Sequence, residues 1–299
     1  MAIKKIIRLL PGFMCWPISS LKMIPSFVII GAQRCGTTSL FNYLIQHPFI
    51  RKPLYKEIHF FDNYNGAYHL GTKWYRGHFP IDNFPFIKKD NSATRVITGE
   101  ATPYYMYHPW CPRRIKDVLP DAKIIALLRN PVDRAYSHYQ HSVRQGYETF
   151  SFEEAIEKEP FRLKGEKEKM LLDPDYYSFS HNLYSYLSRG IYIEQLLNWR
   201  ELFPRKQMLV LRSEDLFSDL PTVYNTVLNF LQLPAHHVDN PVRYNVGDYT
   251  PMPSSLRERL TEFFEPHNQK LYKYLSWDFG WEKGTDTEEE EARSDRAVA

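Results

Sequence analysis

Cysteine is scarce in this sequence, and no set of side chains has the spacing of a metal site. The 299 residues include only Cys15, Cys35 and Cys111, an odd number without metal-ligand spacing. This pattern predicts neither a disulfide framework nor a zinc site. Because free thiols persist in reducing compartments, we expect a cytoplasmic protein.

An excess of charge of one sign is also missing. The formal net charge is +3 at neutral pH, which is too small to indicate a nucleic-acid-binding surface. We therefore expect no nucleic-acid partner. A small anionic ligand is compatible with this charge.

Long hydrophobic runs are absent from the first 24 residues. Pro11, Gly12 and Pro17 interrupt the apolar residues there, and Arg8 and Lys22 add charge. The apolar stretches are too short to span a bilayer, and no small-residue cleavage site follows them. Residues 1–24 are thus predicted to form an N-terminal arm without a transmembrane segment, with weak association to a membrane surface as the alternative.

A single large domain is predicted over residues 25–283. No low-complexity linker divides this stretch, and its length is typical of one α/β domain. Residues 284–299 are polar and include four consecutive glutamates, Glu288 to Glu291. We expect this acidic tail to be disordered.

Strands and helices are predicted to alternate along the domain. Short apolar runs predict strands at residues 27–30, 96–100, 123–129 and 207–212. Apolar residues at helical spacing predict helices over residues 37–46, 132–145, 183–203, 220–231 and 254–275. This alternation predicts an α/β three-layer sandwich, with a central parallel sheet covered by helices on both faces.

A glycine loop follows the first strand and opens the first helix. It has the form G-x-x-x-x-G-T-T from Gly31 to Thr38, and backbone N–H groups in such a position bind anions. In a nucleoside triphosphatase, lysine follows the second glycine and a Ser or Thr holds magnesium. Here Thr37 replaces that lysine, and the nearest cation is Arg34. We find no strand that ends in a suitable Asp, so the loop predicts metal-free binding of an anion smaller than a triphosphate.

A second candidate anion site lies at the end of the third predicted strand. Arg129 ends that strand and Ser137 lies on the following helix, so the two could hold a phosphate by charge-assisted hydrogen bonds. The alternative is an ion pair between Arg129 and an acid such as Asp133. Because ligands collect at the carboxyl ends of parallel strands, two such sites predict a ligand with two separated anionic groups.

Five segments, in family order, resemble the PAPS-dependent sulfotransferases, where PAPS is 3′-phosphoadenosine 5′-phosphosulfate. The resemblance is to the carbohydrate and heparan sulfate branch and its soluble bacterial relatives. The segments are FVIIGAQRCGTTSLFNYLIQHP, KEIHFFD, GEATPYYMYHP, KIIALLRNPVDRAYSHYQH and LTEFFEPHNQKLYKYL, which fall between residues 25 and 281. The resemblance implies the P-loop-like sulfotransferase fold, PAPS as donor, PAP (the desulfated nucleotide) as product, and no metal.

The resemblance also implies which residues bind the donor. The 5′-phosphosulfate loop would consist of Arg34, Cys35, Gly36, Thr37, Thr38 and Ser39. Arg129 and Ser137 would clamp the 3′-phosphate. Arg34 stands where the family usually has lysine, so a planar guanidinium group with several N–H donors replaces the compact ammonium group of lysine. A loop that covers PAPS would fall at about residues 243–249.

The segment from Lys56 to Asp62 carries the candidate catalytic base. In the carbohydrate branch the glutamate of the similar motif acts as base, which implies Glu57 here, with His59 as second choice. The residues expected to contact the acceptor are Lys56, Glu100 and Tyr104. Relatives acting on heparan sulfate often have lysine at the position of Ala101, so its absence argues against a heparan-like polyanionic acceptor.

The expected reaction is in-line transfer of a sulfuryl group from PAPS to a hydroxyl of a small-molecule or carbohydrate acceptor, within class EC 2.8.2. Transfer to nitrogen is an alternative. A narrower alternative is a soluble bacterial enzyme that tailors natural products such as saxitoxin-like alkaloids. Two further alternatives are a P-loop nucleotide kinase and an inactive PAP-binding module. The acceptor and the oligomeric state stay open.

Overall fold

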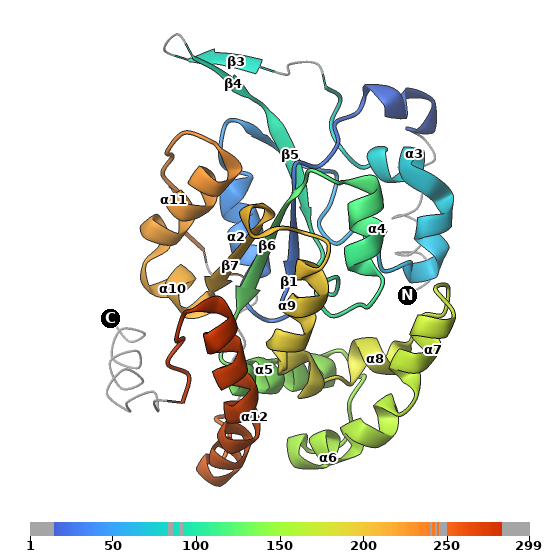
Figure 1. Cartoon of the computed structure of the whole chain (residues 1–299), viewed down its shortest axis with the longest axis vertical. Helices are drawn as coiled ribbons and strands as arrows, with labels where there is room; N and C mark the ends of the chain where they lie inside the picture. The colour runs from blue at the N-terminus through green and yellow to red at the C-terminus, as the bar shows by residue number, and fades with distance from the viewer. Residues whose placement is uncertain are drawn as a thin grey trace.

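A five-stranded parallel sheet forms the centre of the computed structural model, which describes residues 15–82, 86–89, 92–239, 241–242, 244 and 250–282 (Figure 1). The strand order is β2 (Ile50–Arg51), β5 (Ile97–Ala101), β1 (Phe27–Gly31), β6 (Lys123–Leu128) and β7 (Met208–Arg212). Each neighbouring pair is parallel, so the carboxyl ends of all five strands lie at one edge. A separate antiparallel pair joins β3 (Phe86–Lys89) to β4 (Ser92–Arg95).

Two neighbouring strands of the sheet, β1 and β5, are buried along their whole length. Burial on both faces explains the continuous apolar sequence of β1, whereas β5 carries the polar Thr98 and Glu100 into the interior. Phe27 pairs with Gly99 in the register of these two strands. A Cβ added at Gly99 would lie 2.4 Å from Cζ of Phe27, so the phenyl ring occupies the space that a side chain there would need.

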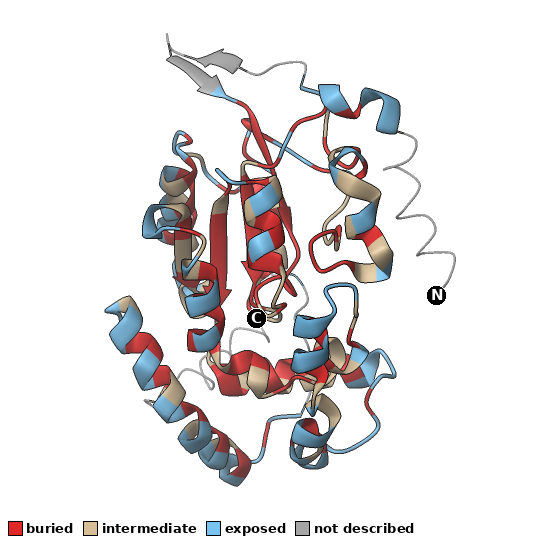
Figure 2. Cartoon of the chain, turned by 45° about the vertical axis from the view of Figure 1, so that its right-hand side comes forward, coloured by how far each residue is buried: buried red, intermediate tan, exposed pale blue. Residues whose placement is uncertain are grey.

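Helices cover both faces of the sheet. In Figure 1, α4 (Cys111–Val118) and α9 (Tyr192–Arg200) lie in front of the strands, and α2 (Thr37–Leu44) lies behind them. On the α2 side, α11 (Leu220–Leu231) contacts both α2 and β7. Figure 2 shows the strands buried between helices with exposed outer faces. The predicted α/β three-layer fold with a central parallel sheet is confirmed.

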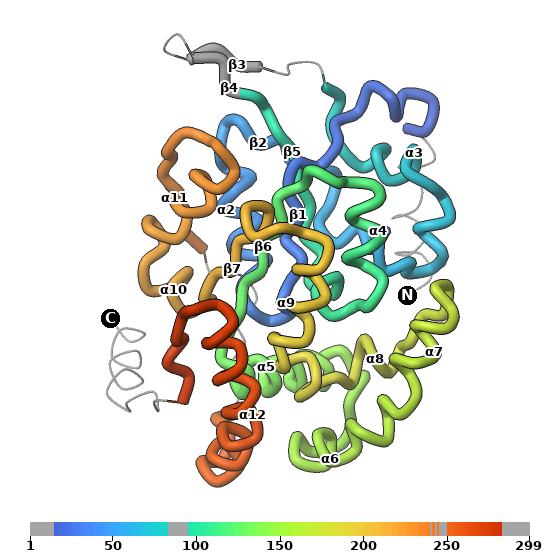
Figure 3. Tube along the Cα trace, viewed as in Figure 1, coloured from blue at the N-terminus to red at the C-terminus, as the bar shows by residue number. Residues whose placement is uncertain are grey.

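A second group of helices lies beyond the carboxyl ends of the strands (Figure 3). Its members are α5 (Pro131–Arg144), α6 (Phe152–Leu163), α7 (Glu166–Leu172), α8 (Phe179–Leu183) and α12 (Ser254–Leu275). The other helices are α3 (Gly71–Arg76), α10 (Ser213–Ser218), and the 3₁₀ segments η1 (Trp16–Leu21), η2 (Tyr64–Leu70), η3 (Ser188–Gly190) and η4 (Arg205–Gln207). Because α5 runs close to the strand ends, its side chains border any site at that edge.

The helix predicted over residues 183–203 is wrong as one continuous element. The chain leaves the helical path after α8, passes through η3, and resumes as α9. The buried carboxylate of Glu159 accepts hydrogen bonds from the backbone N–H groups of Leu187 (2.7 Å) and Ser188 (2.8 Å). An uninterrupted helix would use those N–H groups internally, so a distant acid stabilises the break.

The described part of the N-terminal arm packs against α3. Arg76 donates to the carbonyl oxygen of Ser20 at 3.0 Å, and Lys22 donates to that of Gly77 at 3.3 Å. Residues 1–14 of the arm and the predicted acidic tail from residue 284 lie outside the described residues. Within the described ranges, no helix has both the length and the apolar composition needed to cross a membrane.

Replacing Gly99 by Ala should destabilise the fold, because the new methyl group would overlap the Phe27 ring. We expect a loss of about 1–3 kcal/mol in the free energy of unfolding, measured by urea denaturation. The double variant Phe27→Leu/Gly99→Ala should lose less than the sum of the two single variants. Strict additivity would contradict this account of the contact.

Candidate active site

The glycine loop joins β1 to α2 at the carboxyl edge of the sheet. Its backbone is left-handed at Arg34 (φ 70°) and at Gly36 (φ 83°), the residue that precedes α2. The backbone N–H of Ala32 donates to the carbonyl oxygen of Leu127 in β6 at 2.7 Å, which ties the loop to the neighbouring strand. These contacts place the N-terminus of α2, with its backbone N–H groups and positive dipole end, at the edge where ligands collect.

The two predicted anion sites meet in space. Arg34 Nε donates to Ser137 Oγ on α5 at 3.0 Å, and Arg129 Nη1 donates to the backbone oxygen of Arg34 at 3.5 Å. Asp133, the alternative partner considered for Arg129, forms its ion pair with Arg257 at 2.7 Å. The guanidinium groups of Arg34 and Arg129 therefore lie close to the buried hydroxyl of Ser137 and to the N-terminus of α2. Together these groups form a site that attracts an anion strongly.

Cys35 lies on the inner side of the loop. Its Sγ is 3.8 Å from the hydroxyl of Tyr192, which donates to the carbonyl oxygen of Arg129 at 2.9 Å. Burial raises the pKa of Cys35 to about 11. The side chain therefore stays a neutral thiol at neutral pH. The predicted contact of Cys35 with the donor would then be made by its backbone N–H group.

Arg189 is a residue that sequence reasoning missed. It is buried, donates to Gln33 Oε1 in the loop, and donates to the carbonyl oxygens of His181 (3.0 Å) and Asn182 (2.8 Å). Its guanidinium carbon lies 5.1 Å from the ring centres of both Tyr104 and Tyr107. It sits in η3, the break inside the predicted helix, and no local sequence signal marked that break.

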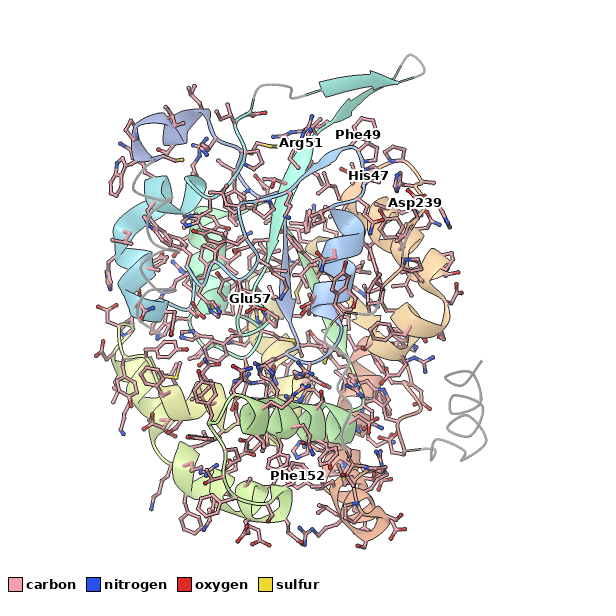
Figure 4. The ribbon with its side chains drawn as sticks, turned by 180° about the vertical axis from the view of Figure 1, so that it is seen from behind. His47, Phe49, Arg51, Glu57, Phe152 and Asp239 are labelled. Carbon is pink, nitrogen blue, oxygen red and sulfur yellow. The ribbon has the colours of Figure 1, made fainter. Side chains whose placement is uncertain are left out.

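Glu57 is anchored beside the end of β5. Its backbone N–H donates to the carbonyl oxygen of Ala101 at 3.1 Å, and its backbone is left-handed (φ 62°), a conformation that often occurs at functional sites. Lys56 Nζ donates to Glu57 Oε1, and Glu57 Oε2 lies 4.0 Å from His59 Nε2. His59 Nδ1 is 2.6 Å from Oδ2 of the buried Asp62. Figure 4 shows Glu57 near the strand ends on the side of α5.

The pKa of His141 on α5 depends on charges from both the glycine loop and the segment of the candidate base. Burial lowers the pKa of this histidine, the charges of Arg34 and Arg144 lower it further, and the charge of Glu57 opposes them. The side chains of Arg34 and Glu57 thus both act electrostatically on this helix.

The other two predicted acceptor contacts lie deeper in the protein. Glu100 is fully buried, and Tyr75 donates its hydroxyl to Glu100 Oε1 at 2.8 Å. Burial raises the pKa of Glu100 to about 8, so the carboxyl group is mostly protonated at neutral pH. Tyr104 is also buried, with its hydroxyl 2.9 Å from His181 Nδ1. Acceptor contact by these two residues stays a prediction.

The predicted covering loop at residues 243–249 lies outside the described residues except for Tyr244. The backbone N–H of Tyr244 donates to Ser39 Oγ at 3.1 Å. On the far side, the carbonyl oxygen of Thr250 accepts from Tyr136 of α5 at 2.6 Å. Tyr244 within this segment and Thr250 directly after it thus contact the two helices that border the glycine loop.

Among the described residues, no group of three or more His, Cys, Asp or Glu side chains is arranged to hold a metal ion. The positive groups at the candidate anion site are side chains of the protein itself, Arg34 and Arg129.

Comparison with known families identifies the class of protein. A family model described as "Sulfotransferase domain" matches residues 25–250, so the chain belongs to the sulfotransferase family. This membership makes the protein a transferase of the sulfotransferase class and confirms the family predicted from the five segments. It argues against the nucleotide kinase alternative.

Individual relatives agree with this assignment. The chain is 29% identical to the membrane-associated sulfotransferase kil1 of Dictyostelium discoideum, over 90% of this chain and 69% of that one. It is 30% identical to the human heparan sulfate glucosamine 3-O-sulfotransferase 3B1, over 88% of this chain and 66% of that one. Among solved structures, a sulfotransferase from Alicyclobacillus acidocaldarius matches with a TM-score of 0.69 and 31% identity, over 87% of this chain and 99% of that one.

The raised pKa of Glu100 predicts how stability depends on pH. The folded state holds this proton more tightly than the unfolded state, so its contribution to stability is lost as pH rises from about 4.5 through about 8. Between pH 5 and pH 9, the wild type should lose at least about 1.4 kcal/mol relative to Glu100→Gln, the equivalent of one pKa unit. Urea unfolding at both pH values measures this, and parallel pH profiles would contradict it.

Proposed function

We propose that the protein transfers a sulfuryl group from PAPS to a hydroxyl group of a small-molecule or carbohydrate acceptor. The observation that carries this proposal is the convergence of Arg34, Ser137 and Arg129 at the N-terminus of α2. Family membership supports the reaction class. Neighbouring cationic groups suit a donor such as PAPS, which carries anionic groups on both the 3′ and the 5′ oxygen of one ribose.

In this proposal the glycine loop and Arg34 hold the 5′-phosphosulfate, and Arg129 and Ser137 hold the 3′-phosphate. The amides at the start of α2 and the Arg34 guanidinium are rigidly placed before the reaction. They stabilise the negative charge that develops on the phosphate oxygen as it leaves sulfur. Lysine, the usual family residue at this position, would supply a point charge, whereas Arg34 can contact the bridging and a terminal oxygen together.

Glu57 is the general base of the proposed reaction. Its carboxylate takes the proton of the acceptor hydroxyl, whose oxygen forms a bond to sulfur as the bond from sulfur to the phosphate oxygen breaks. The electron pair of that bond leaves with PAP. His59 and Lys56 contact Glu57 and orient its carboxylate.

The proposal takes a hydroxyl group as the acceptor, with nitrogen as the alternative, and an uncharged acceptor rather than a polyanion. Relatives of similar identity are named as 3-O-sulfotransferases and as N-sulfotransferases. Ala101 lies beside Glu57 and adds no positive charge there. A narrower form of the proposal is sulfation of a natural product, such as a saxitoxin-like alkaloid, by the same chemistry.

Arg129→Ala should weaken PAP binding by about tenfold or more, because a charge-assisted hydrogen bond to the phosphate is lost. Isothermal titration calorimetry with PAP measures the effect. Arg113→Ala is the matched control, because Arg113 is exposed on α4 and pairs with Asp117. Equal PAP affinity of the Arg129 and Arg113 variants would overturn the assignment of Arg129 to the 3′-phosphate of the donor.

Glu57→Gln should reduce kcat by about 10²- to 10⁴-fold, because the amide cannot accept the acceptor proton. PAP affinity should stay within about threefold of the wild type. The measurement is transfer from labelled PAPS to a panel of small-molecule and glycan acceptors, with Glu153→Gln as an exposed control on α6.

The same panel separates the remaining alternatives. Full activity of Glu57→Gln would move the role of base to His59. Tight PAP binding without transfer to any acceptor, in wild type and variant alike, would instead support an inactive PAP-binding module.

A further inference from the structure

A second pocket lies between α9 and the end of α12, two helices that pack against each other (Figure 1). Its volume is about 230 Å³, and its lining includes Met208, the first residue of β7. Because the strands are parallel, the start of β7 lies toward the edge of the sheet opposite the glycine loop. Among the described residues that line the pocket, none belongs to the candidate active site. The pocket is therefore a separate feature of the molecule.

Much of the pocket lining is apolar, and two of its aromatic residues are exposed. Leu196 is buried and Leu275 is half-buried, so they supply an aliphatic wall. Trp277 is 38% exposed and Tyr274 is 37% exposed, although both are large aromatic residues. The ring of Trp277 stacks on the buried Phe279, with ring centres 4.3 Å apart, and is thus supported from one side. Such a lining suits a ligand with a flat apolar body.

Two arginines give the same pocket a positive charge. Arg200 lies one helical turn after Leu196 on α9, so both side chains contribute to one wall. Within the described residues, Arg200 Nη1 is shielded from solvent and has no hydrogen-bond partner, which is costly for a cationic group. Arg205 of η4 is exposed and also lines the pocket, whereas none of the described lining residues is acidic. An anionic group bound here would offset the uncompensated charge.

The size of the pocket limits what it can hold. Sites for drug-sized ligands have volumes of roughly 300–1,000 Å³, and this pocket, at about 230 Å³, is smaller. It suits a molecule of one or two rings rather than a nucleotide. A bare inorganic anion would leave the apolar wall and the aromatic residues uncovered.

We propose that this pocket binds a small carboxylate with a flat apolar body. The carboxylate lies beside Arg200 and Arg205, which bind it by charge-assisted hydrogen bonds. The apolar body covers Leu196 and packs on the exposed side of Trp277. This binding site goes beyond the proposed sulfotransferase function and does not depend on it.

The test is isothermal titration calorimetry of the full chain with 2-naphthoate as the probe. We expect 2-naphthoate to bind at least about tenfold more tightly than 2-naphthamide, which has the same rings without the charge. Acetate, which has the charge without the rings, should also bind at least about tenfold more weakly. Saturation with PAP should leave the affinity for 2-naphthoate within about threefold, because the two sites are separate.

Variants of the pocket residues locate the bound probe. Arg200→Gln should weaken 2-naphthoate binding by about tenfold, and Trp277→Ala by about three- to tenfold. Arg259→Gln is the matched control, because Arg259 is an exposed arginine of α12 that pairs with Glu153 at 2.9 Å. PAP affinity should be the same in all three variants.

Several outcomes would contradict this inference. They are equal affinity of the Arg200 and Arg259 variants for 2-naphthoate, equal binding of 2-naphthoate and 2-naphthamide, and displacement of 2-naphthoate by PAP. If Arg200→Gln does not fold, unchanged 2-naphthoate affinity of Trp277→Ala decides against the site in its place. A protein that binds PAP but not 2-naphthoate would disprove the second site and leave the proposed sulfotransferase function intact.

Discussion

Parallel pairing of β1 with β5 and β6 is the constraint on which the rest of the structure depends. Parallel strands end at one edge, so the glycine loop after β1, Ala101 at the end of β5 and Arg129 after β6 are brought together. Each of these positions carries or anchors one part of the candidate site. Antiparallel pairing of either neighbour would send its part to the opposite edge of the sheet.

Electrostatic attraction for an anion comes from the protein's own groups in this arrangement. The Arg34 guanidinium bonds to Ser137 across the gap between the loop and α5, and Arg129 contacts the loop backbone. Hydrogen bonds hold Arg34 and Arg129 in place before a ligand binds. Little reorganisation of these two side chains is therefore needed when negative charge develops on a leaving group. The charge of Glu57 also acts on this helix, where it opposes the lowering of the pKa of His141.

The fold could be predicted from the sequence where local signals are strong. The apolar runs of the four predicted strands and the glycine loop have clear patterns, and the structure confirms them, with ends shifted by one residue or so. The parallel sheet and the family resemblance placed the two candidate anion sites at one edge of the sheet, but the direct contact between Arg34 and Ser137, which are 103 residues apart, was not predicted. The roles given to Glu57 and the donor loop stay predictions.

Other features depended on contacts between distant residues and could not be predicted. The break in the helix before α9 is stabilised by hydrogen bonds to Glu159. Arg189 lies in this break, and its guanidinium group donates to Gln33 of the glycine loop. The left-handed backbone at Glu57 and His59 could likewise not be predicted, because glycine, the residue that usually marks this conformation, is absent from both positions. Burial of Glu100 could not be read from a strand whose polar residue looked available to a ligand.

The hydrogen bonds of Glu159 have a consequence for the evolution and engineering of this scaffold. The helices α6 and α7 lie at the periphery of the molecule (Figure 1), where an exchange of the two helices as a cassette would leave the sheet unchanged. Glu159 of α6, however, holds the turn that precedes Arg189, and Arg189 in turn bonds to the glycine loop. Transplanted helices would therefore need an acid at the position of Glu159. Without it, the turn before Arg189 would lose its hydrogen bonds, and the order of the glycine loop would be lost with it.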